Sequence, residues 1–210
     1  MAKLKAPLMS LGAAGQLGKT LVFFPWKGIN AVREYVIPAN PDTQAQKDQR
    51  DFIRKGVAKV HTAQAHEDYP IIVQDQVAYS ALAAAKGRII TWFNQAIKLW
   101  IDVKVKNKIP IIYSFGGMVD KSALDACPLI AINEETANKL KAGKFYLGSS
   151  KTNLIKSKDA SVVEGSRVYL EPGEGFDDLT VGDKYFWQFR PDPEGDCALA
   201  DSGIYYFVAS

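Results

Sequence analysis

One stretch of the sequence, from Gly18 to Phe52, constrains the fold more than any other. Two runs rich in β-branched and aromatic residues, Lys19 to Pro25 and Ile29 to Ile37, are typical of β-strands. The residues between them, Trp26-Lys27-Gly28, predict a short turn, and Gly28 is expected to adopt a positive φ angle. This part of the chain therefore predicts a β-hairpin.

A proline corner and the start of a helix follow the hairpin. Pro38 and Pro41 are expected to end strand pairing, because proline has no N–H to donate to a neighbouring strand. Asp42 or Thr43 then stands at the N-cap position of a helix, and Gln46 lies where a capping box with Thr43 needs it. The path from strand to helix is thus specified locally.

Two helical regions are predicted before the middle of the chain. The first runs from Asp42 to about Ala65, with a partial apolar stripe. The second runs from Gln74 to about Val105, and Gly87 is the expected site of a kink. Trp92 and Trp100 widen the apolar surface of this second region, which is typical of a core or a subunit interface rather than of a cofactor site.

After Pro110 the sequence changes to short strand-like runs separated by clusters of Gly, Asp, Asn, Ser and Pro. Several short strands at this spacing favour a β-sandwich. Together with the helices, this predicts an α+β fold. The expected strands are Ile109–Phe115, Leu129–Ile132, Lys144–Leu147, Arg167–Leu170, Lys184–Arg190 and Gly203–Val208.

The charge is divided unevenly along the chain. Residues 1–108 contain 16 Lys and Arg against 8 Asp and Glu, a balance of +8, whereas residues 109–210 contain 10 against 15, a balance of −5. This split predicts two domains, 1–108 and 109–210. A basic domain and an acidic domain suit subunits that pack basic face to acidic face. Contact of the basic half with nucleic acid, or a solvated surface without a partner, are the alternatives.

Several motifs that suggest chemistry fail on their context. The stretch from Gly12 to Thr20 has glycines at nucleotide-fingerprint spacing, but a strand-like run follows it where phosphate binding requires a helix. The glycines are instead expected in an N-terminal arm of some 18 residues. His61 and His66 are five positions apart and do not share a helix face, so a zinc site is poorly supported. We expect no catalytic, cofactor or metal site.

Two further features bear on the cellular context. The two cysteines, Cys127 and Cys197, are too few for a disulfide framework and are expected as buried thiols. No apolar run is long enough to span a membrane, and residues 1–11 hold too few apolar residues for a secretory signal. We therefore expect synthesis in a cytoplasm, without a signal peptide.

The second half of the chain resembles fibronectin type III domains over about residues 110–210. The resemblance implies an immunoglobulin-like sandwich in which Leu179 and Tyr185 pack a corner, while Val181 replaces the usual proline. Such a fold does not by itself imply a function. The segments that carry the resemblance are Phe145–Leu154, with the pattern Y-x-x-G-x-S-x-x-x-L, Asp178–Arg190, with the pattern L-x-P-G-x-x-Y-x-x-x-V-R, and the closing run Ser202–Val208.

The first half resembles uncharacterised proteins of tailed phages, prophages and environmental viral sequences. The pattern is G-K-x-x-V-F-x-x-W-K-G-x-x-x-V-R-x-Y-V-x-P-x-N-P-x-T-x-x-Q-x-x-x-R, and Thr91–Ile97 belongs to it as well. The resemblance implies a structural role in a virion or another extracellular assembly made in a host cytoplasm. It brings no catalytic residues.

These observations predict a non-enzymatic, self-assembling structural protein, whose partner is itself and which contacts no membrane. The alternative is a nucleic-acid-binding protein that acts through its basic half. A weaker alternative is a carbohydrate or cell-surface binding module in which Tyr205, Tyr206 or Trp187 stacks on sugar rings. The residues expected in assembly or nucleic-acid contacts are Trp26, Lys27, Gly28, Arg33, Arg50 and Arg54.

Overall fold

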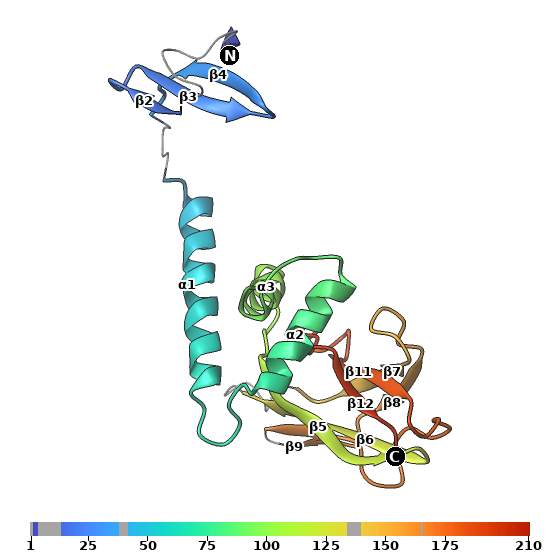
Figure 1. Ribbon diagram of the computed structural model, residues 1–210. Helices are drawn as coiled ribbons and strands as arrows, with labels where there is room; N and C mark the ends of the chain where they lie inside the picture. Colours follow the sequence, from blue (N-terminus) through green and yellow to red (C-terminus); the bar gives the residue numbers. More distant parts are fainter. Residues whose placement is uncertain (1, 4–13, 38–41, 134–139, 165) are drawn as a thin grey trace. The chain divides into compact units, whose positions relative to one another are not determined.

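The computed structural model describes residues 2–3, 14–37, 42–133, 140–164 and 166–210 (Figure 1). The chain forms two compact units, Met1–Gln44 and Ala45–Ser210. The first unit is a small β-sheet, and the second combines helices with two sheets, so the α+β class predicted from the sequence is confirmed. The division differs from the one expected after residue 108, because the helices belong to the same unit as the later strands.

The first unit is a four-stranded antiparallel sheet with the strand order β1-β4-β3-β2. The predicted hairpin is confirmed, and because Trp26 pairs with Ile29, its turn consists of two residues only, Lys27 and Gly28. Within the predicted N-terminal arm, β1 and β2 pair with β4 and β3 of the sheet, while residues 4–13 lie outside the described part. The strands are β1 (Ala2–Lys3), β2 (Gly15–Leu17), β3 (Leu21–Trp26) and β4 (Ile29–Glu34).

The described helices are α1 (Gln44–Gln64), α2 (Val73–Ala85) and α3 (Trp92–Val105). The first predicted helix is confirmed, and Thr43 stands directly before it; the prolines of the corner lie outside the described residues. The single kinked helix expected from Gln74 to Val105 is wrong, because the chain leaves the helix after Ala85. Gly87 has a φ of 67°, and the Thr91 side chain caps α3 by accepting from Asn94 N at 3.4 Å.

Two four-stranded antiparallel sheets make up the rest of the second unit, with the orders β5-β6-β10-β9 and β12-β11-β7-β8. The expected strands all exist, but β5 begins four residues later than expected, at Tyr113 rather than Ile109. The strands β8 and β9 were not expected. The sequence of β8 has no β-branched or aromatic residue, and β9 has only three residues. The strands are β5 (Tyr113–Ser122), β6 (Asp125–Ile132), β7 (Gly143–Gly148), β8 (Lys156–Asp159), β9 (Val162–Glu164), β10 (Arg167–Tyr169), β11 (Lys184–Pro191) and β12 (Tyr205–Val208).

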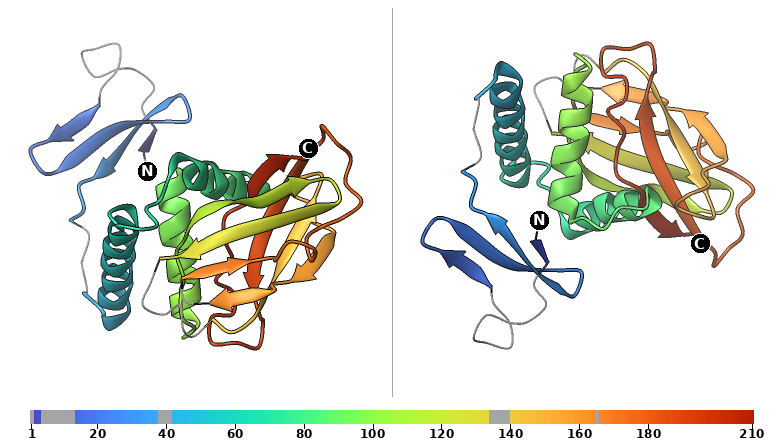
Figure 2. Two further views of the ribbon diagram at one scale, coloured as in Figure 1. Left: turned by 90° about the horizontal axis from the view of Figure 1, so that it is seen from below. Right: turned by 90° about the horizontal axis from the view of Figure 1, so that it is seen from above.

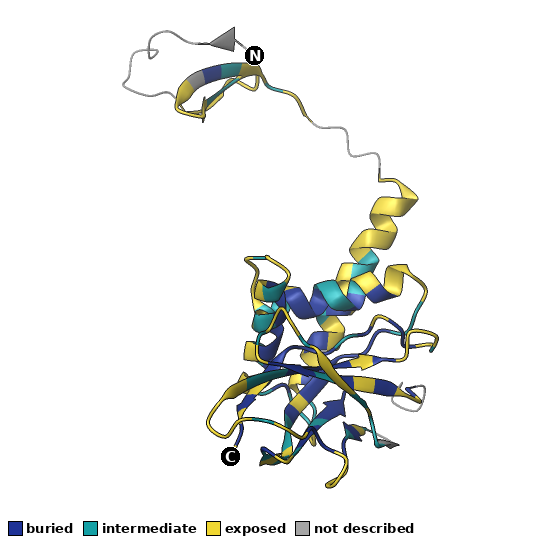
Figure 3. Cartoon of the chain, turned by 90° about the vertical axis from the view of Figure 1, so that its right-hand side faces the viewer, coloured by how far each residue is buried: buried dark blue, intermediate teal, exposed yellow. Residues whose placement is uncertain are grey.

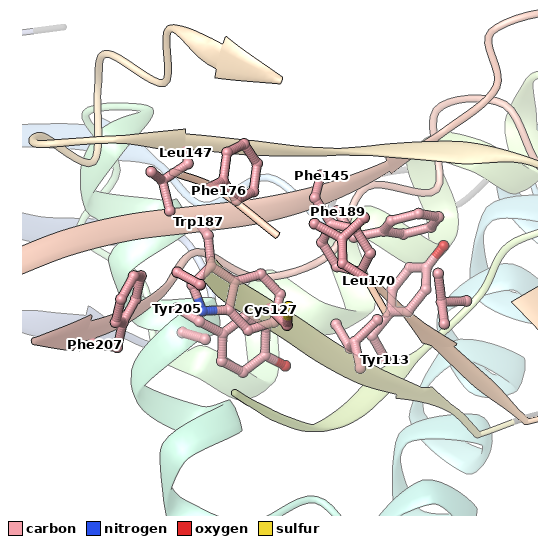
Figure 4. Close-up of a cluster of buried hydrophobic side chains, with 14 of the residues drawn as sticks. Tyr113, Cys127, Phe145, Leu147, Leu170, Phe176, Trp187, Phe189, Tyr205 and Phe207 are labelled. Carbon is pink, nitrogen blue, oxygen red and sulfur yellow. The ribbon is translucent and has the colours of Figure 1, made fainter. Parts of the chain in front are cut away.

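Both sheets contribute to one aromatic core, shown in Figure 4. Trp187 of β11 stacks on Tyr205 of β12 with 4.6 Å between ring centroids, and Phe145 of β7 packs edge-on against Trp187. Cys127 and Cys197 are buried free thiols, as predicted. Burial raises the pKa of the Cys127 thiol to about 12.

Helix α2 packs against this core and contacts both β5 and β12 (Figure 2). Ile204 N donates to Ala78 O at 3.0 Å, which ties the approach to β12 to the helix. The Tyr79 hydroxyl donates to Tyr113 O at 2.9 Å and accepts from Tyr113 N at 3.1 Å. These bonds join α2 to strands far away in the sequence, and the helix and the strands lie in the same compact unit.

Candidate assembly surface

The two faces of the N-terminal sheet follow from its register. Residues directly opposite each other on antiparallel strands point to the same face. One face, the tryptophan face, consists of Gln16, Val22, Phe24, Trp26, Ile29, Ala31 and Arg33. The other, the leucine face, consists of Leu17, Leu21, Phe23, Pro25, Val32 and Glu34. Both faces are therefore mainly apolar.

Both faces of the N-terminal sheet carry large exposed apolar side chains, while Val22, Phe23, Phe24 and Val32 are partly buried. Ala31 is the single residue of β2, β3 and β4, among those described, that counts as buried, whereas Trp26 is 54% exposed and Leu17 is 57% exposed (Figure 3). A sheet with one solvated face normally alternates apolar and polar residues, and apolar residues on both faces are typical of sheets covered on both sides. The side-chain pattern therefore fits a sheet that becomes covered by something else.

The hairpin turn has the geometry that its sequence predicts. Lys27 and Gly28 have φ angles of 49° and 77°, the positive pair that two-residue hairpins of type I′ require. The positive φ predicted for Gly28 is confirmed. A Cβ atom on Gly28 would meet nothing within 4 Å, so its backbone conformation, not lack of space, favours glycine here.

A second turn occupies the glycine-rich stretch that has nucleotide-fingerprint spacing. Gly18 and Lys19 have positive φ angles, and both the amide and the hydroxyl of Thr20 donate to Leu17 O at 3.0 Å. Strand β3 follows directly, as expected, so the helix N-terminus that would hold a phosphate does not follow this turn.

Four of the six expected contact residues lie together on this sheet. Trp26 and Arg33 share the tryptophan face, and the Arg33 guanidinium carbon lies 5.4 Å from the ring centroid of Phe24. Lys27 and Gly28 form the exposed turn beside Trp26. The other two expected residues, Arg50 and Arg54, are exposed on α1 of the second unit, one helical turn apart.

The positive charge of the protein is concentrated in the first unit. Residues 1–44 contain five Lys and Arg against two Asp and Glu, a balance of +3, whereas residues 45–210 contain 21 of each and balance to zero. The net charge of +3 therefore corresponds to the sheet unit alone. An apolar sheet with this charge favours partners that are apolar and acidic.

A buried carboxylate in the second unit was not anticipated from the sequence. Asp75 of α2 is buried, and its Oδ2 accepts from Ile72 N at 2.8 Å and Phe115 N at 3.0 Å. Its Oδ1 accepts from Gly116 N at 3.0 Å and from the Tyr205 hydroxyl at 2.9 Å. Burial raises the pKa of Asp75, and the backbone hydrogen bonds oppose that shift.

Asp75 holds a β-bulge in strand β5. Phe115 has a φ of 53°, which is unusual for a bulky residue, and the register of β5 shifts between Ser114 and Gly117. A Cβ on Gly116 would lie 2.1 Å from the Tyr205 ring, so glycine is required there. The available sequence signal was that Asp75 is the single charged residue between Asp68 and Lys86.

The histidines take local hydrogen bonds. His61 Nδ1 lies 3.0 Å from Gln64 Oε1, and His66 Nδ1 accepts from the amides of Asp68 and Tyr69 at 3.2 and 3.1 Å. Over the residues that the structure describes, no three His, Cys, Asp or Glu side chains are grouped so that they could hold a metal ion. Among the helices in the described ranges, none has both the length and the apolar character needed to cross a membrane.

The aromatic residues considered for sugar stacking divide between core and surface. Tyr205 and Trp187 are buried, while Tyr206 is exposed. The Lys184 Nζ lies 3.7 Å from the centroid of the Tyr206 ring, and the Arg190 guanidinium carbon lies 4.5 Å from that of Tyr146. The rings on this outer face are thus already in contact with cations of the same chain.

Comparison of the chain with protein-family models, with curated proteins and with solved structures finds no match.

Proposed function

We propose that the protein is a non-enzymatic structural protein that assembles with copies of itself through its N-terminal sheet. The observation that carries the proposal is that both faces of the sheet carry large exposed apolar side chains, Leu17 and Leu21 on one and Trp26 and Ile29 on the other. A unit of about this size buries too little surface to be stable without a partner, a metal or disulfides. Both free thiols lie in the second unit, so the sheet has no such crosslink.

The energetic gain from covering the sheet is substantial. Complete burial of a large apolar side chain contributes about 1.5–3 kcal/mol, so covering one that is half exposed contributes about 0.7–1.5 kcal/mol. Leu17 and Leu21 offer this gain on the leucine face, and Trp26 and Ile29 offer it on the tryptophan face. A two-fold dimer through one face would leave the other bare, so two apolar faces favour repeating contacts.

For the second unit we propose an immunoglobulin-like sandwich of the fibronectin type. Labelled A to G in chain order with C′ after C, its sheets have the orders A-B-E-D and G-F-C-C′, which correspond to the sheets of immunoglobulin domains. The Tyr185 hydroxyl accepts from Thr180 N at 3.0 Å, the backbone bond of a tyrosine corner, and Leu179 packs nearby against the core.

The particle to which such a protein belongs is, in our proposal, that of a virus or phage. The resemblance of the first half to proteins of tailed phages supports this, and so does an assembly unit joined to a compact, well-packed second unit. Negative-stain microscopy of the purified protein tests it. Rings, tubes, shells or filaments of regular repeat are expected, and a field of single small particles at high concentration would contradict it.

Sedimentation velocity of the full chain over a range of concentrations tests self-association directly. The expected result is a sedimentation coefficient that rises with concentration. The variant Trp26→Glu is expected to weaken association, whereas Ile89→Glu, which changes a fully exposed residue of the second unit, serves as the matched control. A monomer at every concentration and at low salt would sink the proposal.

Nucleic-acid binding through the tryptophan face is a second candidate. The +3 charge of the first unit, with Arg33 and Trp26 on one face, favours it. Cations would contact phosphates, and Trp26 would stack on a base. Filter binding of single-stranded DNA tests this idea, which requires an affinity that falls as salt rises.

A further inference from the structure

One end of the second unit gathers four chain segments that are distant in sequence. Leu179 N donates to Ala123 O at 3.0 Å, and Gly182 N donates to Ala209 O at 2.9 Å. The Lys156 ammonium donates to the carbonyl oxygens of Asp177 and Asp178 at 2.8 and 3.0 Å. These bonds bring together the β5–β6 turn, the start of β8, the β10–β11 connection and the C-terminus, which Figure 1 shows beside β5 and β6.

Three large aliphatic side chains project from this end. Leu124 is 80% exposed, Ile155 is 74% exposed and Val181 is 67% exposed. Each comes from a different one of the segments that the hydrogen bonds join. Single exposed aliphatic residues are common on protein surfaces, but a group of them within a polar rim is typical of an interaction site.

The β10–β11 connection at this end is acidic, while exposed Lys121, Lys156 and Lys184 stand at the neighbouring ends of β5, β8 and β11. Residues 171–183 contain five Asp and Glu and no Lys or Arg. The side chains of Glu174, Asp177, Asp178 and Asp183 are exposed. Lys156 reaches the backbone carbonyls of this connection, while its ammonium lies 4.0 Å from the Asp178 carboxylate. We name this surface the acid-rimmed end, and define it by Leu124, Ile155, Val181, Glu174, Asp177, Asp178 and Asp183.

We infer that the acid-rimmed end is the docking surface for the tryptophan face of a second copy, an inference that rests on the proposed function. The two surfaces are complementary in kind. The tryptophan face offers Trp26 and Ile29 for apolar contact, with Arg33 and the adjacent Lys27 as cations. The acid-rimmed end offers exposed aliphatic side chains together with the carboxylates of the β10–β11 connection. Complementary charge of this kind sets register and suppresses wrong partners.

The consequence of this pairing is head-to-tail growth. The two surfaces are different, so each copy contacts one neighbour through its tryptophan face and another neighbour through its acid-rimmed end. Contacts of this heterologous kind close into rings or continue into filaments. The leucine face stays available for a further contact between neighbouring copies.

A charge exchange between two full-length chains tests the inference. The first chain carries Lys27→Glu and Arg33→Glu, so its tryptophan face becomes acidic like its acid-rimmed end. The second chain carries Asp177→Lys and Asp183→Lys, so its acid-rimmed end becomes basic like its tryptophan face. Each chain alone should require at least about a tenfold higher concentration to assemble, because like charges then meet. A 1:1 mixture should assemble as the wild type does. The acidic tryptophan face of the first chain then meets the basic altered end of the second chain, and the basic tryptophan face of the second chain meets the acid-rimmed end of the first.

The matched control places the same charge change at the opposite end of β11. Glu194 and Asp196 are exposed in the connection after β11, whereas Asp183 directly precedes that strand. The variant Glu194→Lys with Asp196→Lys should assemble like the wild type. Light scattering measures assembly, and far-UV circular dichroism checks that each variant is folded.

The outcomes separate this inference from the proposed function. If the wild type never assembles, the proposed function fails and the inference fails with it. If the wild type assembles, but the Asp177→Lys and Asp183→Lys chain does so equally well, only the inference is overturned. Failure of the mixture to recover assembly overturns it too, since the occupant of the acid-rimmed end is then some other surface or protein.

Discussion

Replacement of Asp75 by asparagine tests the hydrogen-bonded cluster around this buried carboxylate in the second unit. The carboxylate accepts four hydrogen bonds, from Ile72 N, Phe115 N, Gly116 N and the Tyr205 hydroxyl. An asparagine keeps one oxygen, and its NH2 group must face two of these donors. The cheaper orientation puts the nitrogen at the Oδ1 position, because the Tyr205 hydroxyl can turn and accept from it.

The magnitude follows from the donor that is left over. In that orientation Gly116 N has no acceptor, and a buried donor without an acceptor costs about 1–3 kcal/mol. The remaining bonds lose the charge of the carboxylate, while the cost of burying that charge is also removed, and these two effects oppose each other. We expect Asp75→Asn to lower the free energy of unfolding by about 1–3 kcal/mol. Asp75→Ala leaves all four donors without an acceptor and should cost at least about 4 kcal/mol.

Urea denaturation followed by far-UV circular dichroism, at concentrations below assembly, measures these losses. Asp102→Asn is the matched control, because it makes the same change on α3 in an exposed pair with Lys98, and it should alter the free energy by about 0.5 kcal/mol or less. If Asp75→Asn unfolds at the same urea concentration as Asp102→Asn, the assigned role of Asp75 is wrong.

The pH dependence gives a second readout of the same residue. Burial raises the pKa of Asp75 above its usual 3.8, so the folded state binds a proton that the unfolded state has already released. The contribution of Asp75 to the free energy of unfolding is complete below the pKa that this group has in the unfolded chain. It is lost as the pH rises through the higher pKa that the group has in the folded protein. The difference in stability between wild type and Asp75→Asn should therefore shrink with rising pH over this window.

The remaining predictions concern two glycines and the thiols. Gly116→Ala should destabilise the second unit by about 1–3 kcal/mol in thermal or urea unfolding, because its Cβ would overlap the Tyr205 ring; unchanged stability would show that the ring can move aside. Gly28→Val should strain the hairpin turn by about 1–2 kcal/mol and reduce the yield of assembled particles, while unfolding of the second unit stays unchanged; normal particle yield would contradict the role given to the turn. Cys127 and Cys197 should resist a thiol reagent at pH 8 until the protein unfolds, because both are buried and the pKa of Cys127 is raised to about 12; fast labelling of the folded protein would refute this.

The features that could be predicted from the sequence are those encoded over a few neighbouring residues. The hairpin was predictable because the short stretch Trp26-Lys27-Gly28, with a glycine suited to a positive φ angle, lies between two β-rich runs, although the register shows that only Lys27 and Gly28 form the turn. Helix α1 was predictable from its partial apolar stripe and from Thr43 before its start. The corner at Tyr185 was expected only from the resemblance to fibronectin type III domains, and the Tyr185 hydroxyl accepts from Thr180 N five residues earlier in the chain.

Features that depend on distant parts of the chain could not be predicted in this way. Asp75 stands in a helix, and its carboxylate is explained by donors that lie 40 and 130 residues further along the chain, at Phe115 and Tyr205. Strand β2 is a short edge strand that its sequence, Gly15-Gln16-Leu17, does not distinguish from a loop. The break between α2 and α3 was mistaken for a kink, because Gly87 supports either conformation.

The unequal charge of the two halves was visible in the sequence, but its location was not. The basic residues of the first half are shared between the N-terminal sheet and α1, which belong to different units. Of the expected contact residues, Trp26 and Arg33 share a face. This follows from the register of the hairpin, in which Trp26 lies opposite Ile29 and Val22 lies opposite Arg33.

The most direct test of the central claim is amide hydrogen exchange of β3 and β4 as a function of protein concentration. If the N-terminal sheet is the assembly module, residues 21–34 should exchange quickly at concentrations where the chain is a monomer and should become protected as it assembles. The amides of β7 and β11, inside the core of the second unit, should be protected at every concentration. Protection of residues 21–34 that does not change while the chain assembles would contradict the claim.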